Sequence, residues 1–424
     1  MNFVKNILTT QLFRISSLNS LSIVVRIAGG LLASKMIALF IGPAGMALTG
    51  NLRNFLTSID AFTTLGLQNG IIKYTAENES DTVKLQRALA TICISTLVAV
   101  LLCGLVLFLP APYWSSIIFN GSAQFSWVFR LLALVLPLYT GSLVFVAILN
   151  GLGNYKQVIY LTIWGNALGV TMSAVFIWQY GLHGAFLGIV LSPVIVFFIA
   201  VCYLWKRFPG LKFCNLAYFD ASLIKGLFSY SLMSLVTAVL GPIIYISIRN
   251  LIVQSVSVSN AGYWEAINRI ATFYLMFAST LLTVYFLPKL SVAKTNSETR
   301  AIFLSYYKSV VPVYALGLLA VYLLRLFIVK TLFSAEFLPM ENLFAWQLAG
   351  DFFKVCSLIL GFEFFAKKMT RAFIVTEIFS FIVLYTSSRF FIVRYGSEGA
   401  VMAHAFTYFI YLTTLHIYFL YNKR

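Results

Sequence analysis

The sequence predicts an all-α integral membrane protein, with twelve transmembrane helices arranged as two six-helix lobes around a central cationic cavity. Three observations support this prediction. The 424 residues are 60% hydrophobic and only 10% charged, whereas soluble domains have about 25% charged residues. Apolar runs long enough to cross a bilayer recur along the chain. The two halves share short motifs, and basic residues interrupt several apolar runs.

The apolar runs give the predicted helices in order. A helix needs about 20 apolar residues to cross the hydrocarbon core. Prolines inside such a helix, here Pro137 and Pro242, can kink it. The chain accommodates twelve spans, at residues 16–41, 46–72, 88–109, 127–149, 157–178, 184–205, 226–253, 260–288, 301–329, 343–366, 372–393 and 400–421.

The cations of the connecting loops predict the orientation of the spans. Of the 21 Lys and Arg residues in the loops or near the ends of the spans, 19 fall on one side of the membrane, and only Lys330 and Arg394 fall on the other. Because cytoplasmic loops accumulate Lys and Arg, both termini are expected in the cytoplasm. The net charge of +17 follows this topology, so we expect no nucleic-acid partner.

Two pairs of motifs indicate an internal repeat. YGLHGA at 180–185 recurs as YGSEGA at 395–400, and each copy is followed by one last span. GPAGMALTGNLR at 42–53 parallels SNAGYWEAINR at 259–269. Because each half holds an even number of spans, the repeats should be parallel, related by an axis along the membrane normal. The expected division is an N-lobe at 1–206, a cytoplasmic linker at 207–225 and a C-lobe at 226–424.

Basic residues lie inside the predicted spans, although a charge in hydrocarbon costs about 2.5–3.5 kcal/mol on insertion scales. We interpret them as lining a watery cationic cavity that holds an anion. Guanidinium groups stay charged and bind phosphate oxygens bidentately, so several from different helices suit a pyrophosphate. The basic residues are Arg26, Lys35, Arg53, Arg130, Arg249, Arg269, Arg325, Lys354 and Arg389. Those predicted to bind the substrate are Arg26, Lys35, Arg53, Arg249 and Arg269.

Acidic residues share the same spans, at Asp60, Glu265, Asp351, Glu363 and Glu377. Intramembrane carboxylates in transporters bind protons or sodium, and the candidates for ion coupling are Asp60, Glu265, Asp351 and Glu363. Spacing leaves a structural alternative for two of them. Glu265 and Arg269, at i and i+4, can form a local salt bridge, and Asp351 and Lys354, at i and i+3, favour a local pair.

The sequence contains no recognisable catalytic or metal-binding constellation. The five cysteines lie in or beside spans without C-x-x-C spacing, and His183, His404 and His416 match no metal-ligand spacing. A G-x-x-x-x-G-K-[ST] loop and a Ser/His/Asp cluster are also missing from the sequence. We therefore expect a protein that is not an enzyme, with no metal and no cofactor beyond a coupling proton or sodium ion.

Several segments carry a resemblance to a known family. They are LLASKMIALFIGPAGMALTGNLRNF at 31–55, NGIIKYTAE at 69–77, YFLPKLS at 285–291, LFSAEF at 332–337 and LFAWQLAGDFFKV at 343–355. Together they resemble the Wzx-type flippases for lipid-linked oligosaccharides, the O-antigen and lipid III translocases. These flippases belong to the superfamily of multidrug, oligosaccharidyl-lipid and polysaccharide exporters. Arg26, Lys35, Arg53 and Arg249 stand at basic positions of the family pattern, and Asp351 with Lys354 matches its GDxxK signature. Arg269 and Asp60 depart from the pattern.

The resemblance implies twelve helices in two lobes that work by alternating access. It implies a substrate of undecaprenyl pyrophosphate bearing an oligosaccharide, moved from the cytoplasmic to the periplasmic leaflet of the bacterial inner membrane. Ion movement or the membrane potential would reset the carrier. We expect membrane lipid around the protein and function as a monomer, because each chain holds both lobes. A polysaccharide polymerase and a chain-length regulator are candidate partners.

Two alternative functions stay open. A multidrug exporter of the same superfamily would need an acidic or apolar cavity for cationic drugs, which the intramembrane arginines disfavour. A polytopic O-antigen polymerase or ligase would need a catalytic periplasmic surface. The predicted periplasmic connections are short, and one of the longest, at 110–126, has no charged residue.

Overall fold

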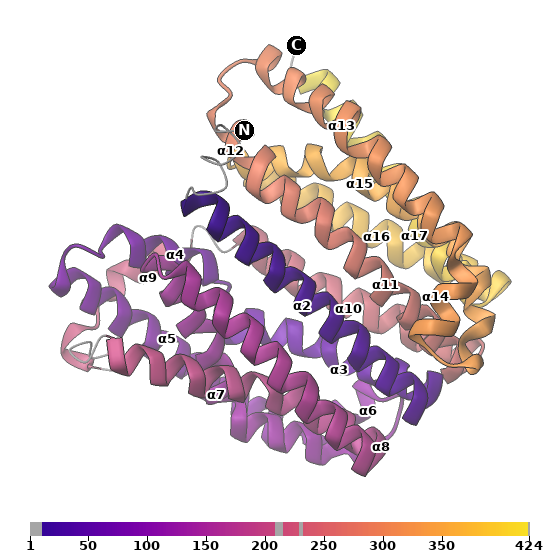
Figure 1. Cartoon of the computed structure of the whole chain (residues 1–424), viewed down its shortest axis with the longest axis horizontal. Coiled ribbons are helices and arrows are strands. Elements are labelled where there is room, and N and C mark those ends of the chain that lie inside the picture. The colour runs from indigo at the N-terminus through magenta and orange to yellow at the C-terminus, as the bar shows by residue number, and fades with distance from the viewer. Residues whose placement is uncertain (1–10, 208–214, 229–231, 423–424) are drawn as a thin grey trace, which may run out of the picture. The chain divides into compact units, whose positions relative to one another are not determined.

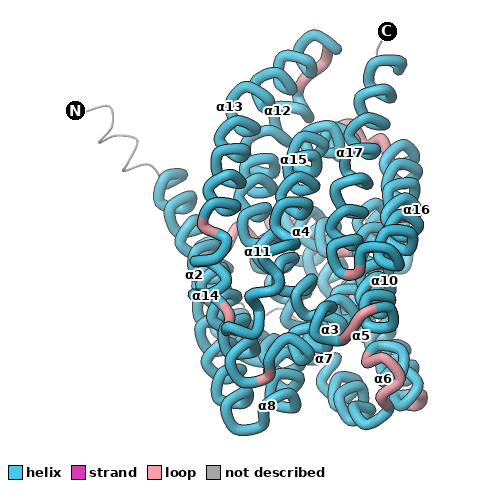
Figure 2. The backbone as a smooth tube through the Cα atoms, turned by 90° about the vertical axis from the view of Figure 1, so that its right-hand side faces the viewer, coloured by secondary structure: helices cyan, strands magenta, loops and turns pink. Residues whose placement is uncertain are grey.

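The computed structural model describes residues 11–207, 215–228 and 232–422, and this part of the chain is helical, without strands (Figure 2). The predicted linker at 207–225 therefore lies partly outside the described residues, as do the loop cations Lys5, Lys212, Lys423 and Arg424. Within the described residues, nine helices are long and apolar enough to cross a membrane. The all-α membrane class is confirmed, and the count of twelve spans stays a prediction.

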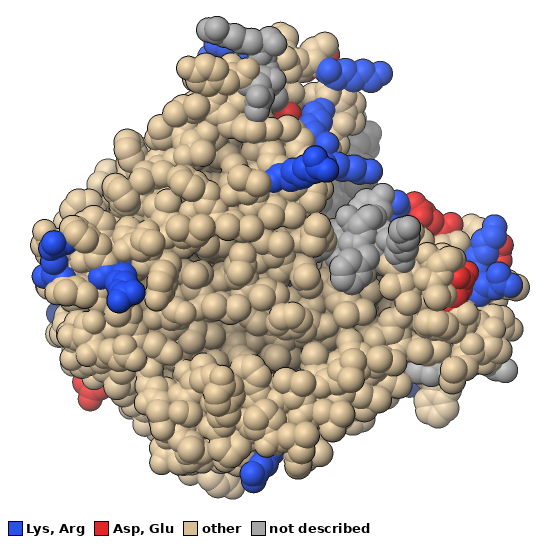
Figure 3. Space-filling view, turned by 180° about the vertical axis from the view of Figure 1, so that it is seen from behind, with Lys and Arg blue, Asp and Glu red and all other residues tan. Residues whose placement is uncertain are grey.

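The long helices expose many apolar side chains on their outer faces. On α5 (Thr82–Phe108), Leu101, Leu102 and Leu105 are 56%, 60% and 59% exposed. Most of the face drawn in Figure 3 carries neither basic nor acidic side chains. Such a surface is unfavourable in water and suits lipid tails, against which a helix needs no further hydrogen-bond partners.

The helices group into two compact units. The first contains Met1–Phe40 and Phe55–Ala238, and the second contains Ile41–Asn54 and Val239–Arg424. Helix α3 (Gly42–Thr63) therefore contributes its start to the second unit and its remainder to the first. The predicted lobes at 1–206 and 226–424 stay a prediction.

The first unit is built around its longest helix, α8, which packs against α2 and α7, while α5 packs against α7 (Figure 1). Leu67, Leu89 and Ile148 belong to its apolar core. Asp81 caps α5 by accepting from two backbone N–H groups, and the bond from Lys84 lowers the pKa of its carboxyl group. The other elements are α2 (Gln11–Phe40), α4 (Gln68–Glu77), α6 (Ala111–Ile118), η1 (Ala123–Phe125), α7 (Ser126–Gly151), α8 (Tyr155–Arg207), η2 (Leu216–Tyr218) and α9 (Ala221–Phe228).

The second unit is built around α15 and α17, which pack against each other (Figure 1). Helix α13 packs on α15, and α16 packs on α17. Helix α11 continues through a π-helical turn, η3, into α12. The elements are α10 (Leu232–Ser255), α11 (Val258–Leu281), η3 (Leu282–Phe286), α12 (Leu287–Val292), α13 (Asn296–Leu323), α14 (Arg325–Leu332), η4 (Ala335–Leu343), α15 (Phe344–Ala366), α16 (Thr370–Tyr395) and α17 (Ser397–Asn422).

The repeated Tyr-Gly motif folds in the same way in each unit. Gly181 breaks α8 with φ 55° and ψ −125°, and Gly396 separates α16 from α17 with φ 60° and ψ −138°. A Cβ atom on Gly184 would overlap the backbone oxygen of Phe176, and one on Gly399 would overlap the backbone of the residue eight positions before it. In each unit the motif therefore makes a tight turn between two closely packed helices, and only glycine adopts this backbone conformation without strain.

We predict that Gly181→Ala and Gly396→Ala each destabilise the protein by about 1–3 kcal/mol, because an L residue is strained at these dihedral angles. Thermal unfolding of the purified protein in detergent measures the effect as a lower Tm. Gly317→Ala is the control, since a Cβ there meets nothing within 4 Å and its helical backbone suits alanine. An unchanged Tm for both motif variants would contradict the strain assigned to the motif.

Candidate functional site: a buried polar pocket in the second unit

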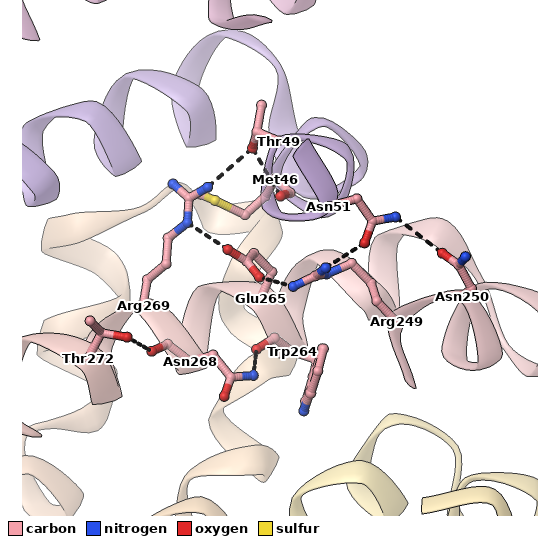
Figure 4. Close-up of polar contacts among 10 residues, drawn as sticks. All are labelled: Met46, Thr49, Asn51, Arg249, Asn250, Trp264, Glu265, Asn268, Arg269 and Thr272. Atoms are coloured by element: carbon pink, nitrogen blue, oxygen red, sulfur yellow. Dashed lines mark hydrogen bonds and ion pairs between the residues drawn. The ribbon is translucent and has the colours of Figure 1, made fainter. Parts of the chain in front are cut away.

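A buried carboxylate joins two arginines in the second unit. Glu265 of α11 accepts hydrogen bonds from Nη2 of Arg249, on α10, and from Nε of Arg269 at 3.0 Å (Figure 4). Glu265, Arg249 and Arg269 are only 7%, 1% and 6% exposed. Buried ions are tolerated when they are paired and hydrogen-bonded. This ion triad, as we call the three side chains, is therefore a fixed polar centre.

The start of α3 gives the ion triad neutral partners. Nη1 of Arg249 donates to Oδ1 of Asn51 at 2.5 Å, and Nη2 of Arg269 donates to Oγ1 of Thr49 at 3.2 Å (Figure 4). Asn51 in turn donates to Oδ1 of Asn250 at 3.1 Å. Each guanidinium is thus held from two directions, which fixes the position of its charge.

Gly50 allows the carboxylate to lie against α3. A Cβ atom at position 50 would lie 2.8 Å from Oε1 of Glu265 and would overlap its Cδ. The starts of α3 and α11 also touch, because a Cβ on Gly262 would overlap the backbone oxygen of Pro43. A residue with a side chain at position 50 would therefore displace the acid from its two arginines.

A second buried carboxylate lies on α15. Asp351 is 0% exposed and accepts hydrogen bonds from the hydroxyl of Tyr274, from Nε2 of Gln347 at 3.0 Å and from Nε2 of His404, on α17, at 3.0 Å. Gly350 permits this approach, since a Cβ there would overlap Cδ2 of His404. We call Asp351 and His404 the Asp351–His404 pair.

Both carboxylates line one pocket of about 180 Å³. Three cations, Arg249, Arg269 and Lys354, also line it, so the pocket has an excess of one positive charge when His404 is neutral. Nζ of Lys354 lies 5.0 Å from the centre of the Tyr408 ring. No carboxylate of the described residues lies within 4.0 Å of Nζ of Lys354. This ammonium group is therefore the pocket cation whose charge is least neutralised.

The residues predicted to bind the substrate fall in both units. Arg249 and Arg269 line the pocket. Arg53 belongs to the second unit and interacts electrostatically with two members of the ion triad, but it does not line the pocket. Arg26 and Lys35 lie on α2, in the first unit, and do not line it either.

The candidates for ion coupling are also separated. Glu265 is held in the ion triad, and Asp351 forms the second buried carboxylate of the pocket. Glu363, about 18 Å further along α15, lines a different cavity of about 260 Å³ and is 1% exposed. Asp60 lies in the first unit, where the hydroxyl of Tyr139 donates to its Oδ2 at 3.4 Å.

One of the two local pairs suggested by spacing is present. The Glu265–Arg269 salt bridge is confirmed, and Arg249 joins it from another helix. Asp351 and Lys354 interact electrostatically but form no ion pair within 4.0 Å in the described part of the chain, and the ion-pair partner of Asp351 is His404 on α17. Helix packing brings a better placed partner than the one available on the same helix.

Sequence reasoning did not identify His404, Gln347, Thr49 or Asn51 as part of a site. Two features of the sequence could have indicated some of these residues. Gln347 precedes Asp351 by four positions and so shares its helix face. The parallel between segments 42–53 and 259–269 pointed to the two chain segments that meet at the ion triad. The pairing of α15 with α17, which brings in His404, has no sequence signal of this kind.

We predict that Glu265→Gln lowers the stability of the protein more than Arg269→Gln. The first change leaves two buried arginines without a counter-charge, a loss of about 3–5 kcal/mol. The second leaves the Glu265–Arg249 pair intact. Thermal or SDS-induced unfolding of the purified variants shows which of the two is less stable. A charge exchange of Glu265 with Arg269 should not restore stability, since Arg249 would then face a second arginine. The reverse order of the two single variants would contradict the ion triad.

Residues 15–294 match the family described as "Polysaccharide biosynthesis protein". Over 395 residues, covering 92% of this chain and 94% of the relative, the sequence is 33% identical to the lipid III flippase of Escherichia coli strain K12. The lipid III flippase of Shigella flexneri is similar to the same extent.

Solved structures show the same fold at low sequence identity. An inward-facing multidrug resistance MATE family transporter of the MOP superfamily superposes with a TM-score of 0.78, at 14% identity, over 94% of this chain and 98% of that one. The outward-facing conformation of a MATE family transporter gives a TM-score of 0.67 at 15% identity, over 96% of each chain. The protein therefore has the MATE-like fold of a membrane transporter and belongs to the polysaccharide biosynthesis protein family.

Proposed function

We propose that this protein is a flippase that moves undecaprenyl-pyrophosphate-linked oligosaccharide from the cytoplasmic to the periplasmic leaflet of a bacterial inner membrane. The relatives named lipid III flippase, aligned over nearly the full chain, support the substrate class. The observation that carries the proposal is the pocket of the second unit, where three cations face two carboxylates inside a helical membrane protein.

The chemistry of the pocket suits a diphosphate. Guanidinium groups in general stay charged at cellular pH, and the planar donors of Arg249 and Arg269 match phosphate oxygens. The ion triad fixes these two groups in place, so their side chains lose little conformational entropy when an anion binds. Lys354 adds a charge that no described carboxylate neutralises within 4.0 Å. We propose that Lys354 and Arg269 contact the diphosphate and that Arg249 positions Glu265.

The pocket admits only part of such a substrate. Ligand pockets usually have about 300–1,000 Å³, and this one has about 180 Å³. A diphosphate group fits this volume better than an oligosaccharide does. The glycan would occupy water-filled space beyond the pocket, and the prenyl chain would stay in lipid. Arg26, Lys35 and Arg53 are proposed as further cations that the substrate meets during its passage.

The proposed transport cycle is alternating access by two six-helix lobes, 1–206 and 226–424, joined by the linker 207–225. The excess of loop cations on one side supports cytoplasmic termini. Ion movement or the membrane potential would reset the carrier, with Asp60, Asp351 and Glu363 as coupling candidates. The chain would act as a monomer beside a polysaccharide polymerase and a chain-length regulator.

Transport of cationic drugs, the alternative suggested by the fold of the MATE structures, is disfavoured by the pocket. An excess of positive charge in a site of low dielectric repels a cationic ligand and attracts an anion.

The leaflet that holds the lipid-linked glycan tests the proposed function. Spheroplasts of a strain without this protein are treated with a membrane-impermeant reagent that modifies the glycan. We expect the glycan to accumulate in the protected, cytoplasmic leaflet. Single repeat units accumulating in the accessible outer leaflet would show that translocation is intact and would contradict the proposal.

We predict that Lys354→Gln lowers transport in this assay about tenfold or more, because a charge-assisted hydrogen bond contributes about 1.5–3 kcal/mol. Lys354→Arg should retain most activity, since it keeps the charge. Lys330→Gln, which removes an exposed cation from α14, is the matched control and should behave as wild type. Full activity of Lys354→Gln at normal protein levels would rule out a role of this ammonium group in binding the diphosphate.

A further inference from the structure

The Asp351–His404 pair contains a titratable imidazole that diphosphate binding alone does not require. His404 is 5% exposed, and its Nε2 lies 3.0 Å from Oδ1 of Asp351 and 3.5 Å from Nε2 of Gln347. A carboxylate only accepts hydrogen bonds, and an amide nitrogen only donates them. One ring nitrogen cannot serve both neighbours, and the shorter contact requires that Nε2 of His404 carries its hydrogen toward Asp351.

This assignment leaves Nδ1 of His404 as the basic nitrogen of the neutral ring. None of the described residues donates a hydrogen bond to it. His404 also lines the pocket, so a proton from water in the pocket can reach the ring. Histidine is the side chain whose charge ordinarily changes between pH 5 and 8.

Asp351 is equipped to stabilise the protonated ring. Its Oδ2 accepts from the hydroxyl of Tyr274 and from Nε2 of Gln347, and its Oδ1 accepts from His404. Three donors fix the position of the carboxylate and hold it against the imidazolium that forms.

The titratable groups that face the pair come from the helices packed around it. They are Tyr245 and Arg249 of α10, Tyr274, Glu265 and Arg269 of α11, Tyr314 of α13, Lys354 of α15 and Tyr408 of α17. Glu377 of α16 instead accepts a hydrogen bond from Tyr411. Among the described residues, the titratable groups of α12, η3 and η4 make no hydrogen bond to Asp351 or His404.

We propose that His404 is a proton-binding site that controls the charge of the pocket, so that proton binding and diphosphate binding favour each other. A proton taken up at Nδ1 of His404 raises the formal excess charge of the pocket from one to two. This inference rests on the proposed function in one respect: the anion that binds is a diphosphate.

The direction of the effect follows from linkage. A site that is more positive when protonated binds an anion more tightly, and the bound anion strengthens proton binding by the same factor. Affinity for the anion should therefore rise as pH falls through the titration of His404. We expect a gain of about fivefold or more, the lower end of the usual coupling between two sites.

The experiment measures binding of inorganic pyrophosphate to the purified full-length protein between pH 8 and pH 6, without added sodium. Wild type is compared with His404→Gln, and His416→Gln is the control, because it removes an exposed histidine from the same helix. The probe's own protonation affects all three proteins equally and cancels in the comparison. We expect the affinity for pyrophosphate to rise more at low pH in wild type and in His416→Gln than in His404→Gln. An equal gain in His404→Gln would overturn the proposal.

A further measurement keeps the test decisive. NMR of histidine-labelled protein follows the His404 signal with pH, and we expect it to titrate in wild type and to shift its titration in Asp351→Asn. A His404 signal that does not change from pH 5 to pH 8 would overturn the proposal, even if His404→Gln does not fold. If pyrophosphate fails to bind at every pH, the diphosphate function fails, and the NMR titration still decides the proton site.

Discussion

The polar centre of the second unit depends on one carboxylate, Glu265, which two buried arginines share. Without it, Arg249 and Arg269 would place two like charges side by side in a region of low dielectric. The carboxylate can reach both only because Gly50 offers no side chain on the facing helix. A single glycine on α3 therefore decides whether α10 and α11 can hold two arginines beside a pocket.

This arrangement changes how the intramembrane arginines act. A cavity lined with free guanidinium groups would bind any anion strongly and release it slowly. Here Glu265 and Asp351 together offset two of the three cationic charges of Arg249, Arg269 and Lys354, so one positive charge is left over. The pocket is therefore only weakly cationic at rest, which suits a carrier that must release its substrate. A proton on His404 is the addition that would strengthen it.

Much of the fold and part of the site follow from the sequence. Helical membrane spans are recognised from long apolar runs, and the Tyr-Gly motifs at 180 and 395 marked two turns that share one backbone conformation. Spacing along one helix was enough to identify Glu265 with Arg269. It could not identify Arg249 as the third member, because that contact depends on how α10 packs against α11. For the same reason spacing paired Asp351 with Lys354, whereas the packing of α15 on α17 pairs it with His404.

The central claim, that the pocket recognises a diphosphate, can be tested directly by ligand binding. The measurement compares how tightly the purified protein binds a prenyl diphosphate and the prenyl alcohol of equal length. The difference between the two affinities is the contribution of the diphosphate group, and it is determined for wild type and for Lys354→Gln. A pocket that holds this group predicts a strong preference for the diphosphate in wild type, reduced about tenfold or more in Lys354→Gln. Equal preference in the two proteins would place the recognition of the substrate elsewhere in the chain.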